Sequence, residues 1–195
     1  PFYYLNNQNE ILDHYQYISD ELNTQLWVYN IPSTVKNEIL PSTTLKLVKE
    51  EIAIGIKDSS GMLENIANLS ISVKRSNVKM NLFIGSTFMT TLTEGIQVDG
   101  VIPGLANLIP NSFAKAWESG LSEKDADLSK YQDEIIKATT IMNLGKNHSI
   151  SPIACIKAGL VHLGIIESDK MTKPFEALSN NEKQKMKSLI NDLLT

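Results

Sequence analysis

Residues 52–61 read Ile-Ala-Ile-Gly-Ile-Lys-Asp-Ser-Ser-Gly, an apolar run that ends in a lysine and a small polar loop. A near-continuous apolar run of this length predicts a strand that is buried on both faces of a parallel sheet. Residues 25–31 repeat the pattern, and residues 82–85 and 99–102 are shorter versions of it. Four such strands, separated by stretches of helical periodicity, predict a parallel α/β fold.

Amphipathic stretches occupy the intervals between these strands and continue beyond the last one. We predict helices at residues 9–23, 41–51, 62–76, 87–97 and 110–119, and three more at 122–144, 151–163 and 179–194. Ser122 and Ser179 each precede an acidic residue by three positions, which predicts an N-cap at each. No strand signal follows Gly120. The sequence therefore predicts an α/β part over residues 1–120 and a three-helix subdomain over residues 121–195.

The composition is that of an ordinary globular protein, with 42% hydrophobic and 21% charged residues among 195. A net charge of −4 gives no basic surface for nucleic acid or an anionic membrane, and no apolar run reaches the roughly 20 residues of a membrane helix. The lone cysteine, Cys155, cannot form an internal disulfide, so we predict a reducing, cytoplasmic setting and a buried thiol. No nucleotide-binding glycine motif occurs, and the three histidines lack metal-ligand spacing. We therefore predict neither a cofactor nor a metal.

Lys57 and Tyr29 each stand at the end of a predicted strand, just before a turn or a polar loop. A lysine in an apolar setting has a lowered pKa, and its free amine can attack a carbonyl carbon. The carboxyl ends of neighbouring parallel strands meet at one edge, so the Tyr29 phenol can approach Lys57 and move a proton. Each residue also has an ordinary interpretation: Lys57 extending from a strand end into water, and Tyr29 covering the core.

Four motifs in fixed order carry a family resemblance: Phe-Tyr-Tyr at 2–4, Tyr-Asn-Ile-Pro at 29–32, Gly-Ile-Lys-Asp-Ser-Ser-Gly at 55–61 and Asp-Gly-Val-Ile-Pro-Gly-Leu-Ala-Asn at 99–107. The chain resembles the dihydrodipicolinate synthase/N-acetylneuraminate lyase family of Schiff-base-forming enzymes that handle pyruvate. The resemblance runs over essentially all 195 residues. It implies a TIM (β/α)8 barrel, of which this chain would hold the C-terminal strands, followed by the helical subdomain.

The resemblance also implies roles for individual residues. Lys57 would form an imine with the 2-oxo carbon of a 2-keto acid, Tyr29 would relay protons, and Tyr4 would assist the relay of a neighbouring subunit in a homodimer or homotetramer. The positions that would contact substrate are Ser59, Gly85, Ser86, Thr87 and Ile102. The protonated imine itself accepts the electron pair, so the implied chemistry requires no metal.

Departures from the family pattern rank the possible substrates. The synthases carry an arginine five residues after the motif tyrosine, where this chain has Thr34, and its one arginine, Arg75, falls in a predicted helix. Phe88 falls near the acidic pair of the neuraminate lyases, which disfavours a sialic acid. We therefore expect cleavage of a 2-keto-3-deoxy sugar acid, such as 2-keto-3-deoxygluconate, to pyruvate and an aldehyde. The alternatives are a 4-hydroxy-tetrahydrodipicolinate synthase, which condenses pyruvate with aspartate semialdehyde, and an inactive paralogue or fragment.

The strand count bears on the extent of the barrel. Four full strands are recognised, and a closed barrel of this type needs eight. The family's Gly-Thr-Thr-Gly-Glu motif does not occur in the sequence. We therefore expect the chain to be the C-terminal portion of a longer enzyme.

Overall fold

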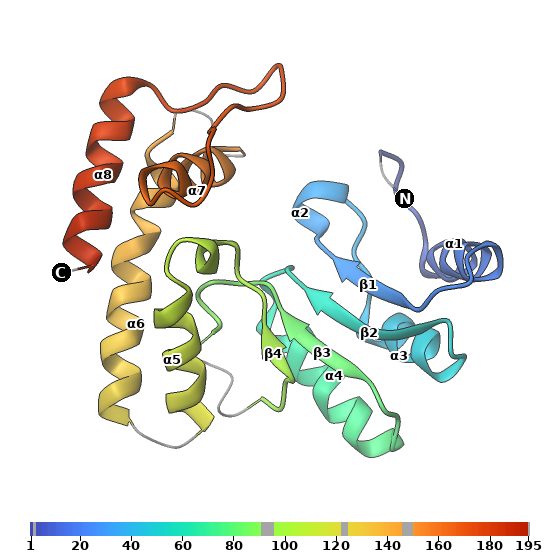
Figure 1. Ribbon diagram of the computed structural model, residues 1–195. Coiled ribbons are helices and arrows are strands. Elements are labelled where there is room, and N and C mark those ends of the chain that lie inside the picture. Colours follow the sequence, from blue (N-terminus) through green and yellow to red (C-terminus); the bar gives the residue numbers. More distant parts are fainter. Residues whose placement is uncertain (2, 91–95, 122–124, 146–149, 195) are drawn as a thin grey trace. The chain divides into compact units, whose positions relative to one another are not determined.

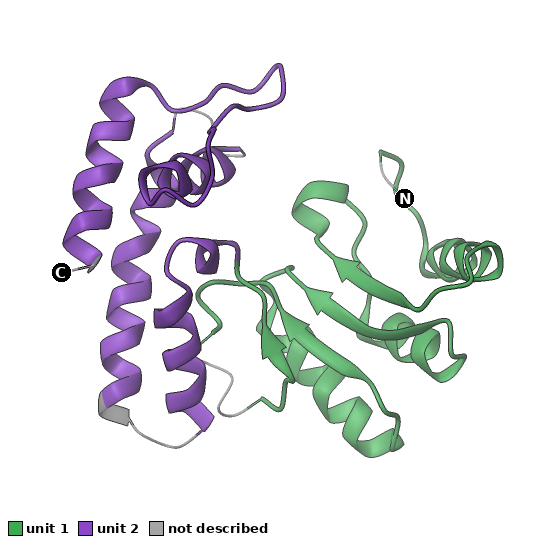
Figure 2. Cartoon of the chain, in the orientation of Figure 1, with its two compact units in different colours: residues 1–103 green, residues 104–195 purple. Residues whose placement is uncertain are grey.

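The computed structural model describes residues 1–195 except 2, 91–95, 122–124, 146–149 and 195 (Figure 1). The chain forms two compact units, Pro1–Pro103 and Gly104–Thr195 (Figure 2). The sequence predicted that the barrel part ends at residue 120 and that the helical subdomain begins at residue 121. This boundary stays a prediction. Of the predicted helix at 87–97, residues 91–95 lie outside the described residues, and residues 87–90 and 96–97 are not helical. The predicted cap at Ser122 also lies outside the described residues.

The first unit is built on a four-stranded parallel sheet in the order β1-β2-β3-β4. Its strands are β1 (Leu26–Asn30), β2 (Ala53–Asp58), β3 (Asn81–Ile84) and β4 (Gly100–Val101). Its helices are α1 (Gln8–Glu21), α2 (Pro32–Val35), α3 (Pro41–Lys49) and α4 (Leu63–Ser76). All four predicted strands and the predicted helices at 9–23, 41–51 and 62–76 are therefore confirmed. The four-residue helix α2 is too short to give a periodic signal, and the sequence did not predict it.

The core of the first unit lies between the sheet and its helices. Successive side chains of a strand point to opposite faces, and Val28, Ile56 and Ile84 are buried in one cluster with Ile11, Leu47 and Ile66 of the helices. The other face carries Trp27 and Tyr29, which are 40% and 46% exposed. The prediction of strands buried on both faces therefore holds for the middle of β2, where Gly55 and Ile56 point to opposite faces and are both buried, and is wrong for β1, where Trp27 and Tyr29 are exposed.

The second unit contains helices and loops, and no strand, in its described part. It contains η2 (Gly104–Asn107), α5 (Pro110–Leu121), α6 (Asp125–Thr139), η3 (Ile141–Asn143), α7 (Ser151–His162) and α8 (Asn180–Leu194). Its core brings together Phe113 of α5, Ile135 of α6 and Ile190 of α8. The predicted helical tail is confirmed, and α5 packs with it.

Cys155 lies in the core of the second unit with no exposed surface, as the sequence predicts. Burial raises the pKa of its thiol, so the thiolate that reacts with disulfide reagents is scarce in the folded chain. We expect a disulfide reagent at pH 8 to label the folded protein far more slowly than protein unfolded in guanidinium. Stability should also fall as the pH rises above the thiol pKa of the unfolded chain, because the unfolded state then releases a proton that the folded state keeps. Equal labelling rates in the two states would contradict this expectation.

No helix in the described ranges has the length and apolar character needed to cross a membrane. The described residues also contain no group of three or more His, Cys, Asp or Glu side chains placed to hold a metal ion.

Candidate active site

The register of β1 and β2 brings Tyr29 and Lys57 together. The two residues are direct partners across the parallel pair, and their side chains rise from the face of the sheet that the helices leave open. The Lys57 ammonium donates a hydrogen bond of 3.3 Å to the Tyr29 hydroxyl, and it lies 4.4 Å from the centre of the Tyr29 ring. An amine and a phenol in contact provide a nucleophile and a proton carrier at one point.

Ser59 and Gly85 pack against Lys57 at the carboxyl ends of β2 and β3. A methyl group at Gly85 would overlap the Ser59 hydroxyl and lie 3.0 Å from Cε of Lys57. Backbone hydrogen bonds fix both positions: the Ser59 amide donates to the carbonyl of Asn30, and the Gly85 amide donates to the carbonyl of Asp58. The absence of a side chain at Gly85 therefore leaves room for the lysine stem beside Ser59.

The remaining candidate residues lie at different distances from this contact. Ser86 and Thr87 lie two and three residues beyond the end of β3 and are half-buried. Ile102 follows β4, is 46% exposed, and donates its backbone amide to the carbonyl of Ile84. Tyr4 is 76% exposed, and its carbonyl accepts a hydrogen bond from Asn37. The structure thus brings Lys57, Tyr29, Ser59 and Gly85 together, and the catalytic and binding roles of all eight candidates stay predictions.

Asn30 and Asp58 end β1 and β2 directly after Tyr29 and Lys57, and the sequence reasoning did not identify them. Their side chains are 1% and 4% exposed, and the Asn30 amide donates to the Asp58 carboxylate over 2.7 Å. The signal that could have found them is a polar residue at the last position of two adjacent buried strands. Buried polar groups of this kind must find partners, and here they find each other.

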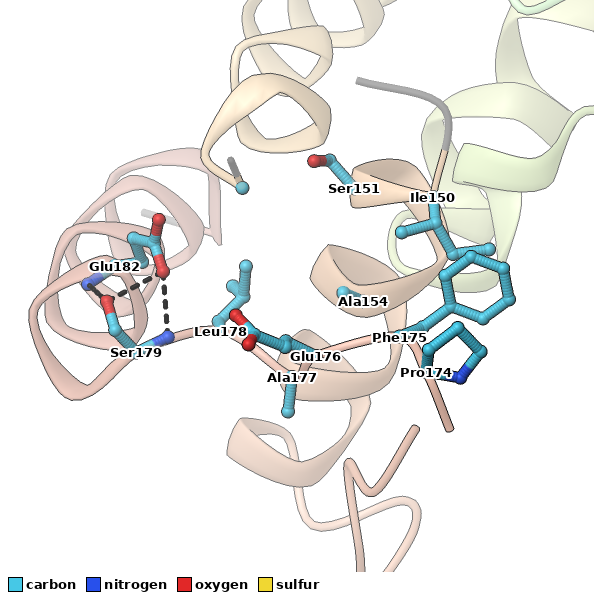
Figure 3. Close-up of a pocket in the computed structure, with 11 residues that line it drawn as sticks. Ile150, Ser151, Ala154, Pro174, Phe175, Glu176, Ala177, Leu178, Ser179 and Glu182 are labelled. Carbon is cyan, nitrogen blue, oxygen red and sulfur yellow. Dashed lines mark hydrogen bonds between the residues drawn. The ribbon is translucent and has the colours of Figure 1, made fainter. Parts of the chain in front are cut away.

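The second unit has a pocket of its own, of about 480 Å³ (Figure 3). Ile150, Ala154, Phe175 and Leu178 supply much of its apolar lining. At its edge the Glu182 carboxylate accepts hydrogen bonds from the backbone amide and the hydroxyl of Ser179, which begins α8 with the predicted cap. The residues that line it include none of the candidate catalytic residues.

Residues 1–193 match the family model described as the dihydrodipicolinate synthetase family. The chain belongs to this family. The family-level resemblance drawn from the four motifs is therefore confirmed, and the family is one of lyase-type enzymes of the class I aldolase kind.

Curated relatives in the family include two 4-hydroxy-tetrahydrodipicolinate synthases. The one from Sulfurihydrogenibium sp. is 27% identical over 191 residues, which are 97% of this chain and 62% of the relative. The one from Buchnera aphidicola subsp. Cinara cedri is 28% identical over 193 residues, covering 98% of this chain and 62% of the relative. The chain thus spans less than two thirds of the length of these relatives.

Solved structures of family members share the fold. A dihydrodipicolinate synthase from Bacteroides thetaiotaomicron matches 98% of this chain and 64% of its own length, with a TM-score of 0.89 and 23% identity. A prophage protein of the dihydrodipicolinic acid synthase family from E. coli K12, solved in complex with pyruvate, has a TM-score of 0.86 and 18% identity. The predicted fold, part of a parallel α/β barrel followed by helices, is confirmed by these likenesses.

Proposed function

We propose that this chain carries the imine-forming centre of a pyruvate-handling lyase, with Lys57 as nucleophile and Tyr29 as proton relay. The observation that supports it is the 3.3 Å contact between the Lys57 amine and the Tyr29 hydroxyl at the carboxyl edge of the sheet. The neutral amine adds to the 2-oxo carbon of pyruvate, and loss of water leaves a protonated imine. Removal of a proton from the neighbouring methyl gives an enamine, whose electron pair attacks an aldehyde. Cleavage of a longer 2-keto acid is the reverse sequence.

For the substrate, the relatives favour condensation of pyruvate with aspartate semialdehyde. Both curated relatives described above are named as 4-hydroxy-tetrahydrodipicolinate synthases. These names support the alternative over cleavage of a 2-keto-3-deoxy sugar acid, which the sequence ranked first. We therefore take the synthase reaction as the leading proposal for the protein that contains this chain.

Thr34 keeps the sugar-acid cleavage as a second candidate. It lies exposed in α2, four residues beyond Asn30 at the end of β1, where the synthases resembled by this chain carry an arginine. A threonine cannot form the paired, charged hydrogen bonds that an arginine makes to a carboxylate. A substrate whose distal end is a chain of hydroxyl groups does not need that pairing.

Borohydride reduction in the presence of labelled pyruvate tests the shared mechanism. We expect the label on the peptide that contains Lys57, because reduction converts the imine to a stable secondary amine. Pyruvate consumption with aspartate semialdehyde, and pyruvate release from 2-keto-3-deoxygluconate, then separate the two substrate proposals. An unlabelled Lys57 in the intact protein would show an inactive paralogue or fragment and overturn the proposal.

The proposal also includes a homo-oligomeric assembly and a cytoplasmic location. Tyr4, at 76% exposure, would serve the proton relay of a neighbouring copy in a homodimer or homotetramer. The cytoplasmic setting likewise stays a prediction. Sedimentation of the intact protein measures its assembly state, and turnover of Tyr4→Phe compared with the wild type at the same assembly state measures the contribution of the Tyr4 hydroxyl.

Replacing Tyr29 by phenylalanine should separate proton transfer from imine formation. The ring and its position beside Lys57 are retained, while the hydroxyl that accepts the lysine hydrogen bond is removed. A positioned proton carrier contributes about 10²- to 10⁴-fold to a rate, so turnover should fall by that order while borohydride still labels Lys57. Tyr17→Phe is the matched control, because Tyr17 is 66% exposed on α1. Unchanged turnover in Tyr29→Phe would remove Tyr29 from the mechanism.

A further inference from the structure

The side chains of Asn30 and Asp58 form a buried pair beneath the Lys57–Tyr29 contact. The two residues are register partners across β1 and β2, one position beyond the partners Tyr29 and Lys57. Side chains alternate between the faces of a strand, so this pair lies on the helix side while Tyr29 and Lys57 lie on the open side. The same two strand ends therefore carry one buried pair and one exposed pair.

Every polar atom of the buried pair is engaged. Asn30 Nδ2 donates to Oδ2 of Asp58 over 2.7 Å, and Oδ1 of Asn30 accepts the backbone amide of Ile39 over 3.1 Å. Oδ1 of Asp58 accepts both the backbone amide and the hydroxyl of Ser60, at 2.9 and 2.6 Å. The Ser60 hydroxyl in turn accepts the amide of Met62 over 3.1 Å, directly before α4.

The backbone of the pair extends this network to the other candidate residues. The carbonyl of Asn30 accepts the amide of Ser59 over 2.8 Å, and the carbonyl of Asp58 accepts the amide of Gly85 over 2.7 Å. Asn30 and Asp58 thus connect the ends of three strands, and they hold both residues that pack beside the lysine stem.

The relative strength of the two pairs indicates which one sets the geometry. The Lys57–Tyr29 hydrogen bond is 3.3 Å long and involves a tyrosine that is 46% exposed. The Asn30–Asp58 bond is short, involves a carboxylate, and is shielded from water, which strengthens it. An exposed, long contact between two flexible side chains cannot fix their backbones, whereas a buried, charge-assisted contact can.

We propose that Asn30 and Asp58 are positioning residues that hold the Tyr29 hydroxyl and the Lys57 amine at reacting distance. This inference rests on the proposed imine chemistry of Lys57. The pair touches neither of the reacting groups and acts through the strand ends that carry them. The pair therefore affects the rate of imine formation at Lys57 and the rate of proton transfer through Tyr29.

A swap of the two side chains tests the inference. In Asn30→Asp, two carboxylates face each other where an amide donor was. In Asp58→Asn, every combination of the two amide orientations leaves two donors facing each other, at residue 58, at the amide of Ile39 or at the amide of Ser60. The double variant Asn30→Asp/Asp58→Asn restores every hydrogen bond: the new amide donates to the new carboxylate, its oxygen accepts from Ser60, and the carboxylate accepts from Ile39.

Two measurements on the intact protein read out the positions of the groups. The first is the rate of borohydride trapping with labelled pyruvate, expressed per folded molecule. The second is the NMR shift of the Lys57 ε-methylene protons, because the Tyr29 ring centre lies 4.4 Å from the adjacent Nζ and displaces their resonance from that of a free lysine. The second measurement does not depend on catalysis.

We expect each single variant to trap pyruvate about 10²-fold more slowly, the cost of misplacing reacting groups by about 1 Å, and to lose much of the ε-methylene shift. The swap variant should recover both. Asn65→Ala is the matched control: its Nδ2 donates to Oε1 of Glu38 over the same 2.7 Å, in the same unit, and it should change neither measurement.

The outcomes separate this inference from the proposed function. Trapping by the wild type together with unchanged trapping and shifts in folded single variants would overturn the inference and leave the function standing. Loss of stability alone, with both readouts unchanged per folded molecule, would also overturn it. No trapping in the wild type would overturn the function, and the ε-methylene shifts would then decide by themselves whether the pair positions Lys57.

Discussion

Lys57→Met should abolish borohydride-dependent labelling by pyruvate and lower turnover by at least about 10³-fold, because it removes the amine that is proposed to form the imine. Methionine keeps an unbranched apolar stem beside Gly85 and Ser59, so the packing of the lysine side chain is largely retained. The change removes the amine and its hydrogen bond to Tyr29. Mass spectrometry of the reduced protein measures the label, and a pyruvate assay measures turnover.

Lys74→Met is the control for this variant. Lys74 lies in the last turn of α4, where loss of one positive charge has the same effect on net charge and none on the strand ends. The Lys74→Met variant should still be labelled on Lys57 and should keep its turnover. Label on another lysine in Lys57→Met, with turnover preserved, would move the imine to that residue and reject the proposed centre.

The sequence predicted the sheet because each strand is marked twice, by its own apolar run and by the helical stretch that follows. It also predicted that Tyr29 and Lys57 meet, since the carboxyl ends of adjacent parallel strands share an edge, and the 3.3 Å contact confirms this. The catalytic roles proposed for these residues must be tested by borohydride trapping and by turnover measurements. The geometry of their meeting needed only the register of two strands.

Asn30 and Asp58 could not be predicted with the same ease. In the sequence, an asparagine and an aspartate at the ends of apolar strands look like ordinary polar residues before a loop. The structure shows that their side chains are 1% and 4% exposed and form a hydrogen bond with each other. The substrate ranking depended largely on one position, Thr34. A relative that is 27% identical and aligns with 97% of the chain is named as a synthase, which favours the alternative that the sequence ranked second.

The face of the sheet that carries Lys57 is also shaped by a residue with no side chain. Trp27 of β1 and Phe83 of β3 stack with ring centres 5.2 Å apart and planes 5° from parallel, although β2 lies between their strands. Gly55 is the register partner of Trp27, and a methyl group added there would lie 2.9 Å from the Trp27 ring, so the missing side chain leaves room for that ring. Gly55 is two residues before Lys57, so the stacked rings neighbour the position from which the lysine rises.

Gly55→Ala should therefore be the most destabilising of three glycine substitutions. Its methyl would lie 2.5 Å from the backbone carbonyl oxygen of Asn81, and a backbone atom in a paired strand cannot move without disturbing β3. We expect a loss of about 1–3 kcal/mol in the free energy of unfolding, the usual cost of overpacking. Gly100→Ala should cost less, because its methyl meets only the edge of the Phe83 ring, at 2.9 Å.

Gly120→Ala completes the series as the matched control. The same methyl there meets nothing within 4 Å and lies within α5, where alanine is favoured over glycine by about 0.5–1 kcal/mol. Urea unfolding of the three variants, followed by circular dichroism and compared at equal slope, gives the order. A Gly55→Ala protein as stable as Gly120→Ala would mean that β2 and β3 can separate without penalty. The stacked rings would then not depend on the missing side chain.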